Sequence, residues 1–359
     1  MHYYLHIPFC VSRCHYCDFF STTLLERREE YVDALLHEIN MRRDGEASTI
    51  YFGGGTPSVL PPDAVKRLLE ALPLPDDSTP TEITIEANPG DLSIDKLSAL
   101  RQTGINRLSI GIQSFQDHLL QRIGRRHDSE GAVRAVREAQ EAGFGNISID
   151  LIYGLPGQTI PMWEEDIETA LRLNVQHISC YCLSYEQGTK LTRQLERGEV
   201  REQDEDTLNR MYDLLCDKLE QAGYEHYEVS NFAMPGFRSR HNSSYWRDKS
   251  YIGLGAGAHS YDARQGTRSW NVSNLEGYIA SISKGIRPCE QEKLTDEQYR
   301  MERIMLGLRT SEGIEKSLIT ASAALRRHLA HGLLRDTGTR YVVTREGIRL
   351  LNRIVEDFT

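Results

Sequence analysis

The stretch that decides the fold is YYLHIPFCVSRCHYC, residues 3–17. Its first part, Tyr3–Ile7, is rich in aromatic and aliphatic residues, which is typical of a β-strand. Three cysteines, Cys10, Cys14 and Cys17, follow the strand within a few residues. The stretch therefore predicts a thiolate site at the carboxyl end of the first strand.

Strand-like and helical patterns alternate over the first half of the chain. Strands are predicted at Tyr3–Ile7, Thr49–Phe52, Glu82–Ala87, Arg107–Gln113, Ser148–Tyr153 and His177–Leu183. Helical patterns lie at about 26–43, 61–71, 93–103, 129–142 and 161–173. This alternation predicts parallel strands with right-handed crossovers. We expect an α/β fold, a partial (β/α)6 barrel of the TIM type, with its chemistry at the carboxyl ends of the strands.

The rest of the chain predicts two smaller parts. Residues 1–225 are expected to form the barrel, including a helix at 204–222. Residues 226–290, rich in Gly, Ser, Asn and aromatic residues, predict a loop-rich cap. Residues 291–359 predict a small C-terminal winged-helix-like α+β domain. Its predicted elements are a helix from about Thr295, a helix at 315–331, a strand at Arg340–Thr344 and a helix at Arg345–Phe358.

The composition excludes several classes of protein. The chain has 359 residues and a formal net charge of -10. Nucleic-acid binding needs clustered Lys and Arg, so we expect none. There is no apolar run long enough for a membrane span, and the start, MHYYLHIPFC, lacks the basic and apolar regions of a signal peptide. With seven cysteines, an odd number, these features predict a reducing, cytoplasmic location.

The three clustered cysteines admit three interpretations. A 4Fe–4S cluster bound by Cys10, Cys14 and Cys17 would keep one iron open, because a cubane normally takes four thiolates. Structural zinc would need a fourth Cys or His at finger-like spacing, and a disulfide would leave one thiol over. Cys180 and Cys182 alternate along a predicted strand, and we interpret them as small buried residues rather than as a fourth ligand.

The CxxxCxxC spacing, with Tyr16 before its last cysteine, resembles the radical S-adenosylmethionine (SAM) superfamily. A glycine run, Gly53-Gly54-Gly55-Thr56-Pro57, follows the second strand and lacks the Lys of a phosphate loop. The resemblance implies that the open iron takes up SAM. It implies SAM contacts from Tyr4, Tyr16, Gly54, Gly55, Thr56, Glu86, Gln113, Arg125, Asp150 and Ser184.

These stretches also resemble oxygen-independent coproporphyrinogen III dehydrogenases and HemW-type haem chaperones. The dehydrogenases carry a further Cys two residues beyond the third ligand, where this chain has Phe19. They also have an N-terminal extension before the cluster motif, whereas this sequence begins three residues before Tyr4. HNSSYW, residues 241–246, matches the HNxxYW motif of the HemW-type proteins. That resemblance implies haem binding by His241, Tyr245 and Trp246. His259 is a second candidate ligand, since His is a common axial ligand of haem iron.

The resemblance to HemW-type proteins implies a haem chaperone with three cofactors, a 4Fe–4S cluster, SAM and haem. It would deliver haem to acceptor haemoproteins, including respiratory enzymes at the membrane, as a monomer or a SAM-dependent dimer. The alternative is an enzyme, a coproporphyrinogen III dehydrogenase that makes protoporphyrinogen by radical chemistry on a porphyrin precursor.

Overall fold

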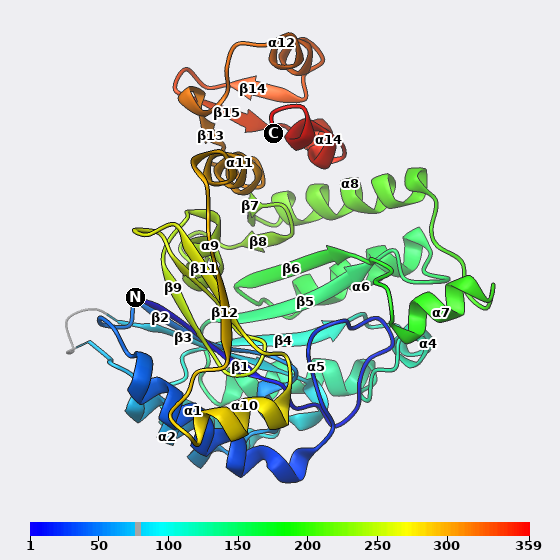
Figure 1. The fold of residues 1–359 in the computed structure, drawn as a ribbon. Helices are drawn as coiled ribbons and strands as arrows, with labels where there is room; N and C mark the ends of the chain where they lie inside the picture. The colour runs from blue at the N-terminus through cyan, green and yellow to red at the C-terminus, as the bar shows by residue number, and fades with distance from the viewer. Residues whose placement is uncertain (76–79) are drawn as a thin grey trace.

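A computed structural model describes residues 1–75 and 80–359. Six parallel strands form its centre, and they confirm the predicted strands to within two residues at each end (Figure 1). They are β1 (His2–Ile7), β2 (Thr49–Gly54), β3 (Glu82–Ala87), β4 (Arg107–Gln113), β5 (Ile147–Tyr153) and β6 (His177–Cys182). Each pairs with the next in parallel register. All carboxyl ends therefore meet at one edge, which we call the carboxyl end of the sheet.

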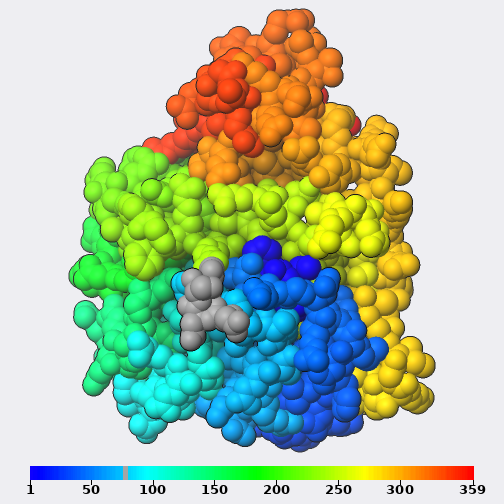
Figure 2. Space-filling view, turned by 90° about the vertical axis from the view of Figure 1, so that its left-hand side faces the viewer, coloured from blue at the N-terminus to red at the C-terminus, as the bar shows by residue number. Residues whose placement is uncertain are grey.

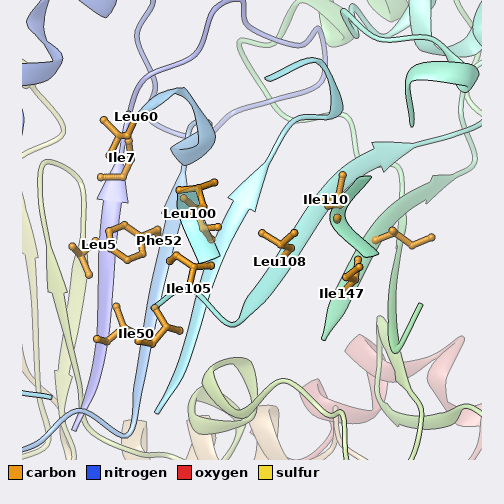
Figure 3. Packing of buried hydrophobic residues seen from close by; sticks show 14 of the residues in the cluster. Leu5, Ile7, Ile50, Phe52, Leu60, Leu100, Ile105, Leu108, Ile110 and Ile147 are labelled. Carbon is orange, nitrogen blue, oxygen red and sulfur yellow. The ribbon is translucent and has the colours of Figure 1, made fainter. Parts of the chain in front are cut away.

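Helices surround these strands, most of them on the outer face. They are α1 (Arg28–Arg42), α2 (Pro62–Ala71), α3 (Ile94–Gln102), α4 (Asp117–Arg122), α5 (Ser129–Glu141), α6 (Ile160–Arg172), α7 (Lys190–Glu196) and α8 (Glu205–Gln221). Of these, α4 and α7 contact His15 in the loop that follows β1. Short 3-10 turns lie at Leu25–Arg27, Pro57–Val59 and Pro89–Asp91. Between helices and strands lies a continuous apolar core that includes Leu5, Phe52 and Ile110 (Figure 3). This burial is the main force that holds the barrel together.

The barrel is open. Its twelve-stranded sheet has the order β12-β11-β10-β9-β1-β2-β3-β4-β5-β6-β8-β7, so β1 pairs with β9 and not with β6. The added strands are β7 (Glu225–Glu228), β8 (Asn231–Ala233), β9 (Tyr251–Leu254), β10 (His259–Asp262), β11 (Thr267–Asn271) and β12 (Cys289–Lys293). With α9 (Arg240–Trp246) and α10 (Leu275–Ile282), they give residues 226–290 more regular structure than the sequence predicts. These strands are only three to five residues long, too short for a clear alternation of polar and apolar residues.

The C-terminal part packs at one end of the molecule, beside α8 and α9 (Figure 1). Its elements are α11 (Asp296–Gly307), β13 (Ile314–Glu315), a 3-10 turn (Lys316–Leu318), α12 (Ala323–Ala330), β14 (Leu334–Asp336), β15 (Arg340–Val343), α13 (Arg345–Ile348) and α14 (Leu351–Glu356). The three strands form a separate sheet with its own core. Two predicted helices differ from the structure: the one at 315–331 begins only at Ala323, after the cap Ser322, and the last one breaks between α13 and α14.

The inner face of the barrel is polar and aromatic. Tyr4 stacks on Tyr51 of the neighbouring strand, and the Tyr51 hydroxyl donates to Glu86. Ser109 on β4 donates to Asp150 on β5. Because side chains of a strand alternate between faces, the residues between these positions are the aliphatic ones that pack under the helices. The interior is thus available for ligands rather than filled by a second aliphatic core.

Candidate functional site

A cavity of about 530 Å³ opens at the carboxyl end of the sheet. The loop that follows β1 forms one wall. Cys10 N–H donates to Thr22 O over 2.9 Å within the loop, and two contacts of His15 tie the loop to the barrel: its N–H donates to Ile123 O over 2.9 Å, and its Nδ1 lies 2.9 Å from Arg122 O. Cys10 is buried, while Cys14 and Cys17 are half-buried. All three cysteines line the cavity, as the sequence predicts.

Polar groups of the barrel are directed at the sulfur atoms. Thr56 Oγ1 lies 3.4 Å from Cys10 Sγ, and an Arg125 terminal nitrogen lies 3.4 Å from Cys14 Sγ. Burial raises the pKa of the Cys10 thiol, and it raises the pKa of Cys17 to about 11. Free thiols at these positions keep their protons at neutral pH, so binding of iron must displace them.

The donor set fits a cluster better than one ion. In residues 1–75 and 80–359, no three His, Cys, Asp or Glu side chains lie close enough together to hold a single metal ion. Thiolates of a cubane bind separate irons and so stand further apart than the ligands of tetrahedral zinc. The cavity also has room beyond the cysteines, which a chelating ligand on an open iron would need.

Close packing of the backbone explains two of the glycines. Gly54 has a φ of 110°, and a Cβ there would lie 2.6 Å from the His6 ring. A Cβ on Gly55 would lie 2.8 Å from the backbone of Pro8. The backbone of both residues lies against the end of β1, and this close approach explains why both are glycine. Both residues also line the cavity.

Two carboxyl groups from neighbouring parts of the barrel line the cavity. Glu86 accepts hydrogen bonds from the Tyr51 hydroxyl over 2.8 Å and from Gly54 N–H over 3.2 Å. Burial raises the pKa of Glu86 to about 7, and Asp150 nearby also favours its neutral form. Burial likewise raises the pKa of Asp150, which accepts from Ser109 Oγ over 3.2 Å. Both carboxyl groups can accept hydrogen bonds from hydroxyl or amine groups of a ligand.

A β-bulge aims one amide into the same cavity. The register of β4 against β5 shifts between Gly111 and Gln113, and Gln113 has a φ of 74°, a conformation that costs a non-glycine residue energy. Arg125 donates a hydrogen bond to Gly111 O, at the other side of the bulge. Backbone strain of this kind is common at ligand sites, and it is compatible with a functional role for Gln113.

Most residues predicted for SAM meet in this one cavity. The lining includes Tyr16, Gly54, Gly55, Thr56, Glu86, Gln113, Arg125, Asp150 and Ser184 together with the three cysteines. Tyr4 is not part of the lining; it lies below, stacked on Tyr51, and its hydroxyl is 3.1 Å from His6 Nδ1. Its predicted contact with SAM stays a prediction.

The structure also adds lining residues that the sequence did not nominate. Tyr181 and Cys182, at the end of β6, both line the cavity and are exposed. The interpretation of Cys182 as a buried residue is wrong, whereas Cys180 is indeed buried. Cys182 is the last residue of β6, and it faces the cavity instead of lying under a helix. The alternation of side chains along a strand does not reveal where the strand ends.

The HNSSYW motif lies in α9, at the opposite, amino end of the sheet. His241 is 0% exposed. Its Nδ1 lies 2.7 Å from Thr49 Oγ1, and its Nε2 lies 2.8 Å from the Tyr245 hydroxyl. Burial lowers the pKa of His241 to about 3, so the ring is neutral. Both ring nitrogens are engaged, and neither is free for iron in this conformation.

The structure does not gather the three motif residues around one open site. Trp246 instead lines a cavity of about 170 Å³ between the barrel and the C-terminal part, together with Glu228 and Arg247. His259 on β10 is exposed and stacks on Trp270, with ring centroids 6.0 Å apart. The assignment of His241, Tyr245 and Trp246 to haem therefore stays a prediction, and it requires α9 to move.

Comparisons with known proteins agree with the fold and identify the family. The sequence model of the Radical SAM superfamily matches residues 4–170, which include all three cysteines and the glycine run. Fold, thiols and match together define a radical SAM protein, whose cofactors are a 4Fe–4S cluster and SAM.

Full-length relatives narrow the class. Heme chaperone HemW of Bacillus subtilis (strain 168) is 37% identical over 99% of this chain and 98% of that protein. Heme chaperone HemW of Escherichia coli (strain K12) is 33% identical over 99% of this chain and 97% of that protein. The chain belongs to the HemW family. In fold, it is similar to the solved coproporphyrinogen III oxidase (HemN) from Escherichia coli, with a TM-score of 0.84 and 24% identity over 99% of this chain and 89% of that one.

Proposed function

We propose that the chain is a haem chaperone, which binds haem and passes it to acceptor haemoproteins. The observation that carries the proposal is similarity over nearly the whole chain to proteins named heme chaperone HemW, including the part beyond residue 170 that the superfamily match does not reach. In the described residues, no helix is long and apolar enough to cross a membrane. We propose action in the cytoplasm, with delivery to respiratory enzymes at the membrane, by a monomer or a SAM-dependent dimer.

We assign the iron–sulfur cluster to Cys10, Cys14 and Cys17. When bound, the cluster supplies an iron with an open position for the amine and carboxylate of SAM, and it is a source of an electron. The chain's own groups then have defined tasks. Thr56 and Arg125 donate towards ligand sulfur atoms, which stabilises the thiolate form. The carboxyl groups of Glu86 and Asp150 accept hydrogen bonds from SAM hydroxyls or its amine.

We assign haem to the HNSSYW motif, in which His241 would supply a ligand to the iron. The imidazole is a common ligand of haem iron, and Tyr245 and Trp246 offer aromatic surface to a porphyrin. Because both nitrogens of His241 are engaged, haem binding must break its contacts with Thr49 and Tyr245. For the motif to hold haem, α9 would therefore have to move away from the strands.

The test is a haem titration of anaerobically reconstituted protein. His241→Gln keeps hydrogen-bonding capacity for Thr49 but cannot replace an imidazole on iron, and we expect it to weaken haem binding at least tenfold. His259→Gln is the matched control, since His259 is exposed and lies outside the motif. If only His259→Gln lost haem affinity, His259 and not His241 would be the iron ligand. If neither variant lost affinity, neither residue would be the iron ligand.

The same preparation distinguishes the chaperone from an enzyme. Haem-loaded protein should reconstitute an apo-haemoprotein acceptor, measured by the acceptor's spectrum. With coproporphyrinogen III and SAM under reducing conditions, we expect no protoporphyrinogen. Formation of that product would replace the chaperone by the dehydrogenase alternative.

A further inference from the structure

A column of side chains crosses the inside of the barrel from the SAM cavity to α9. It consists of Glu86, Tyr51 and His241, one below the other. Tyr51 is 8% exposed and His241 is fully buried, so water has little access to the column. Glu86 lines the cavity at the upper end. The two sites that the sequence nominates are therefore in contact through a single intervening residue.

Tyr51 touches both ends of the column in different ways. Its hydroxyl donates to Glu86 Oε1 over 2.8 Å. Its ring stacks on the His241 ring, with centroids 4.9 Å apart and planes 25° apart. The hydrogen bond orients the carboxyl group, and the stack depends on the position of the imidazole. The single side chain of Tyr51 thus contacts a residue of each site.

Tyr4 adds a second path from α9 to the cluster loop. Its ring stacks on Tyr51 at 6.2 Å and on His241 at 6.5 Å. Its hydroxyl lies 3.1 Å from His6 Nδ1, and His6 Nε2 lies 2.9 Å from Phe20 O, in the loop that carries the cysteines. Withdrawal of the imidazole would remove a packing partner from both tyrosines at once.

The amino end of α9 is held by a carboxylate at the start of β3. Glu82 accepts hydrogen bonds from the backbone N–H of Arg240 over 3.0 Å and of His241 over 2.9 Å. This helix is short, seven residues, and its aromatic contacts with the barrel are made by His241 against Tyr4 and Tyr51 and by Tyr245 against Tyr251. Such an element can open without unfolding the barrel. Figure 2, which faces the side where the strands begin, shows the yellow-green segment that contains it as a band across this face.

We propose that Tyr51 is a positioning residue that makes SAM binding and the withdrawal of His241 from the barrel antagonistic. With His241 in place, Tyr51 is packed on both sides and holds Glu86 in the orientation that lines the SAM cavity. When His241 leaves, Tyr51 loses that support and Glu86 loses its fixed donor. By linkage, SAM that binds the fixed Glu86 must in turn favour the closed position of His241. The extension to haem rests on the proposed function, because only there is His241 the haem ligand.

Hydrogen exchange tests the coupling without haem. Reconstituted protein, kept oxidised so that SAM is not cleaved, is compared with and without saturating SAM. We expect SAM to slow amide exchange in residues 240–246 about fivefold or more, a typical allosteric coupling. Tyr51→Phe keeps the ring and removes the hydroxyl; it should weaken SAM binding several-fold and abolish the SAM effect on exchange, even at saturating SAM.

A matched control separates coupling from general destabilisation. Tyr224→Phe removes another buried hydroxyl, one that donates to Val175 O far from the column, and should keep the full SAM effect. Exchange in 240–246 that does not respond to SAM in the unaltered protein, or that responds equally in Tyr51→Phe, would overturn the proposal.

Haem titrations provide the second arm. In the unaltered protein, saturating SAM should raise the apparent Kd for haem by the same factor by which it slows amide exchange in residues 240–246. In Tyr51→Phe, SAM should leave the apparent Kd for haem unchanged. If His241→Gln leaves haem affinity unchanged, the haem assignment fails, while the exchange experiment still decides the coupling. If haem binds through His241 but exchange ignores SAM, the coupling fails and the haem assignment stands.

Discussion

The two ends of the barrel carry the two sequence motifs, yet they differ in openness. At the carboxyl end, the three cysteines and the glycine run surround a cavity of about 530 Å³. At the amino end, His241 of HNSSYW is fully buried and hydrogen-bonded at both nitrogens. The carboxyl end is thus ready for its ligands, whereas the amino end must first open. A sequence motif therefore identifies the residues of a site, but only the packed structure shows whether that site is open or closed.

Removal of one thiol should have the largest effect, and this effect should be confined to the cluster site at the open end. Cys14→Ala leaves two thiolates, too few to retain a cubane, so we expect near-complete loss of bound iron and sulfide after reconstitution. Cys182→Ala is the matched control, because Cys182 lines the same cavity but is not assigned as a ligand. Iron and sulfide analysis measures both. Equal loss in Cys182→Ala would make that residue a fourth ligand and close the open iron.

At the closed end, removal of the imidazole should destabilise the fold. His241→Ala removes the partner of the Tyr245 hydroxyl and one of the two partners of the Thr49 hydroxyl, which keeps His2 Nδ1 at 2.8 Å, and it opens a void beside Tyr51. We expect a loss of about 3–5 kcal/mol in the free energy of unfolding, measured by urea denaturation. A loss below about 1 kcal/mol would mean that α9 is already open in solution.

A buried carboxyl group near Trp246 should make stability at the closed end depend on pH. Burial raises the pKa of Glu228 to about 7, from an ordinary value of 4.5. The folded state therefore holds this proton more tightly than the unfolded state. The stability that the protonated Glu228 contributes is fully present below about pH 4.5 and is lost as the pH rises to about 7. Above that pH, Glu228 causes no further change in stability.

Glu228→Gln should remove that dependence. Relative to the unaltered protein, the variant should gain stability between pH 5 and pH 8 by up to about 3 kcal/mol. Urea denaturation of both proteins across this range measures the difference. A difference that stays constant with pH would mean that Glu228 is charged in the folded state.

The smallest effect is expected at the rim of the open end. Phe19 is 65% exposed, so Phe19→Ser loses the burial of only about a third of the residue's surface. We expect a change within about 0.5 kcal/mol in the free energy of unfolding and unchanged iron content. A large loss of either would show that the rim is covered in solution, which would remove the contrast between the ends.

The sequence predicts the six parallel strands because each carries a run of apolar residues that the helices must cover. It also predicts the cavity, since residues such as Glu86 and Gln113 lie at strand ends that meet in any parallel sheet. It does not predict that β1 pairs with β9, because this pairing joins segments some 250 residues apart and leaves no local pattern. Nor does it reveal Tyr51, which belongs to no motif and gains its role only from its neighbours in the fold.

The most direct measurement is Mössbauer spectroscopy of anaerobically reconstituted protein with iron-57, before and after addition of SAM. If Cys10, Cys14 and Cys17 bind three irons of a cubane and SAM takes the fourth, one iron in four should change its isomer shift when SAM is added. A spectrum without a cubane, or one in which all four irons ignore SAM, would contradict the account of the open end.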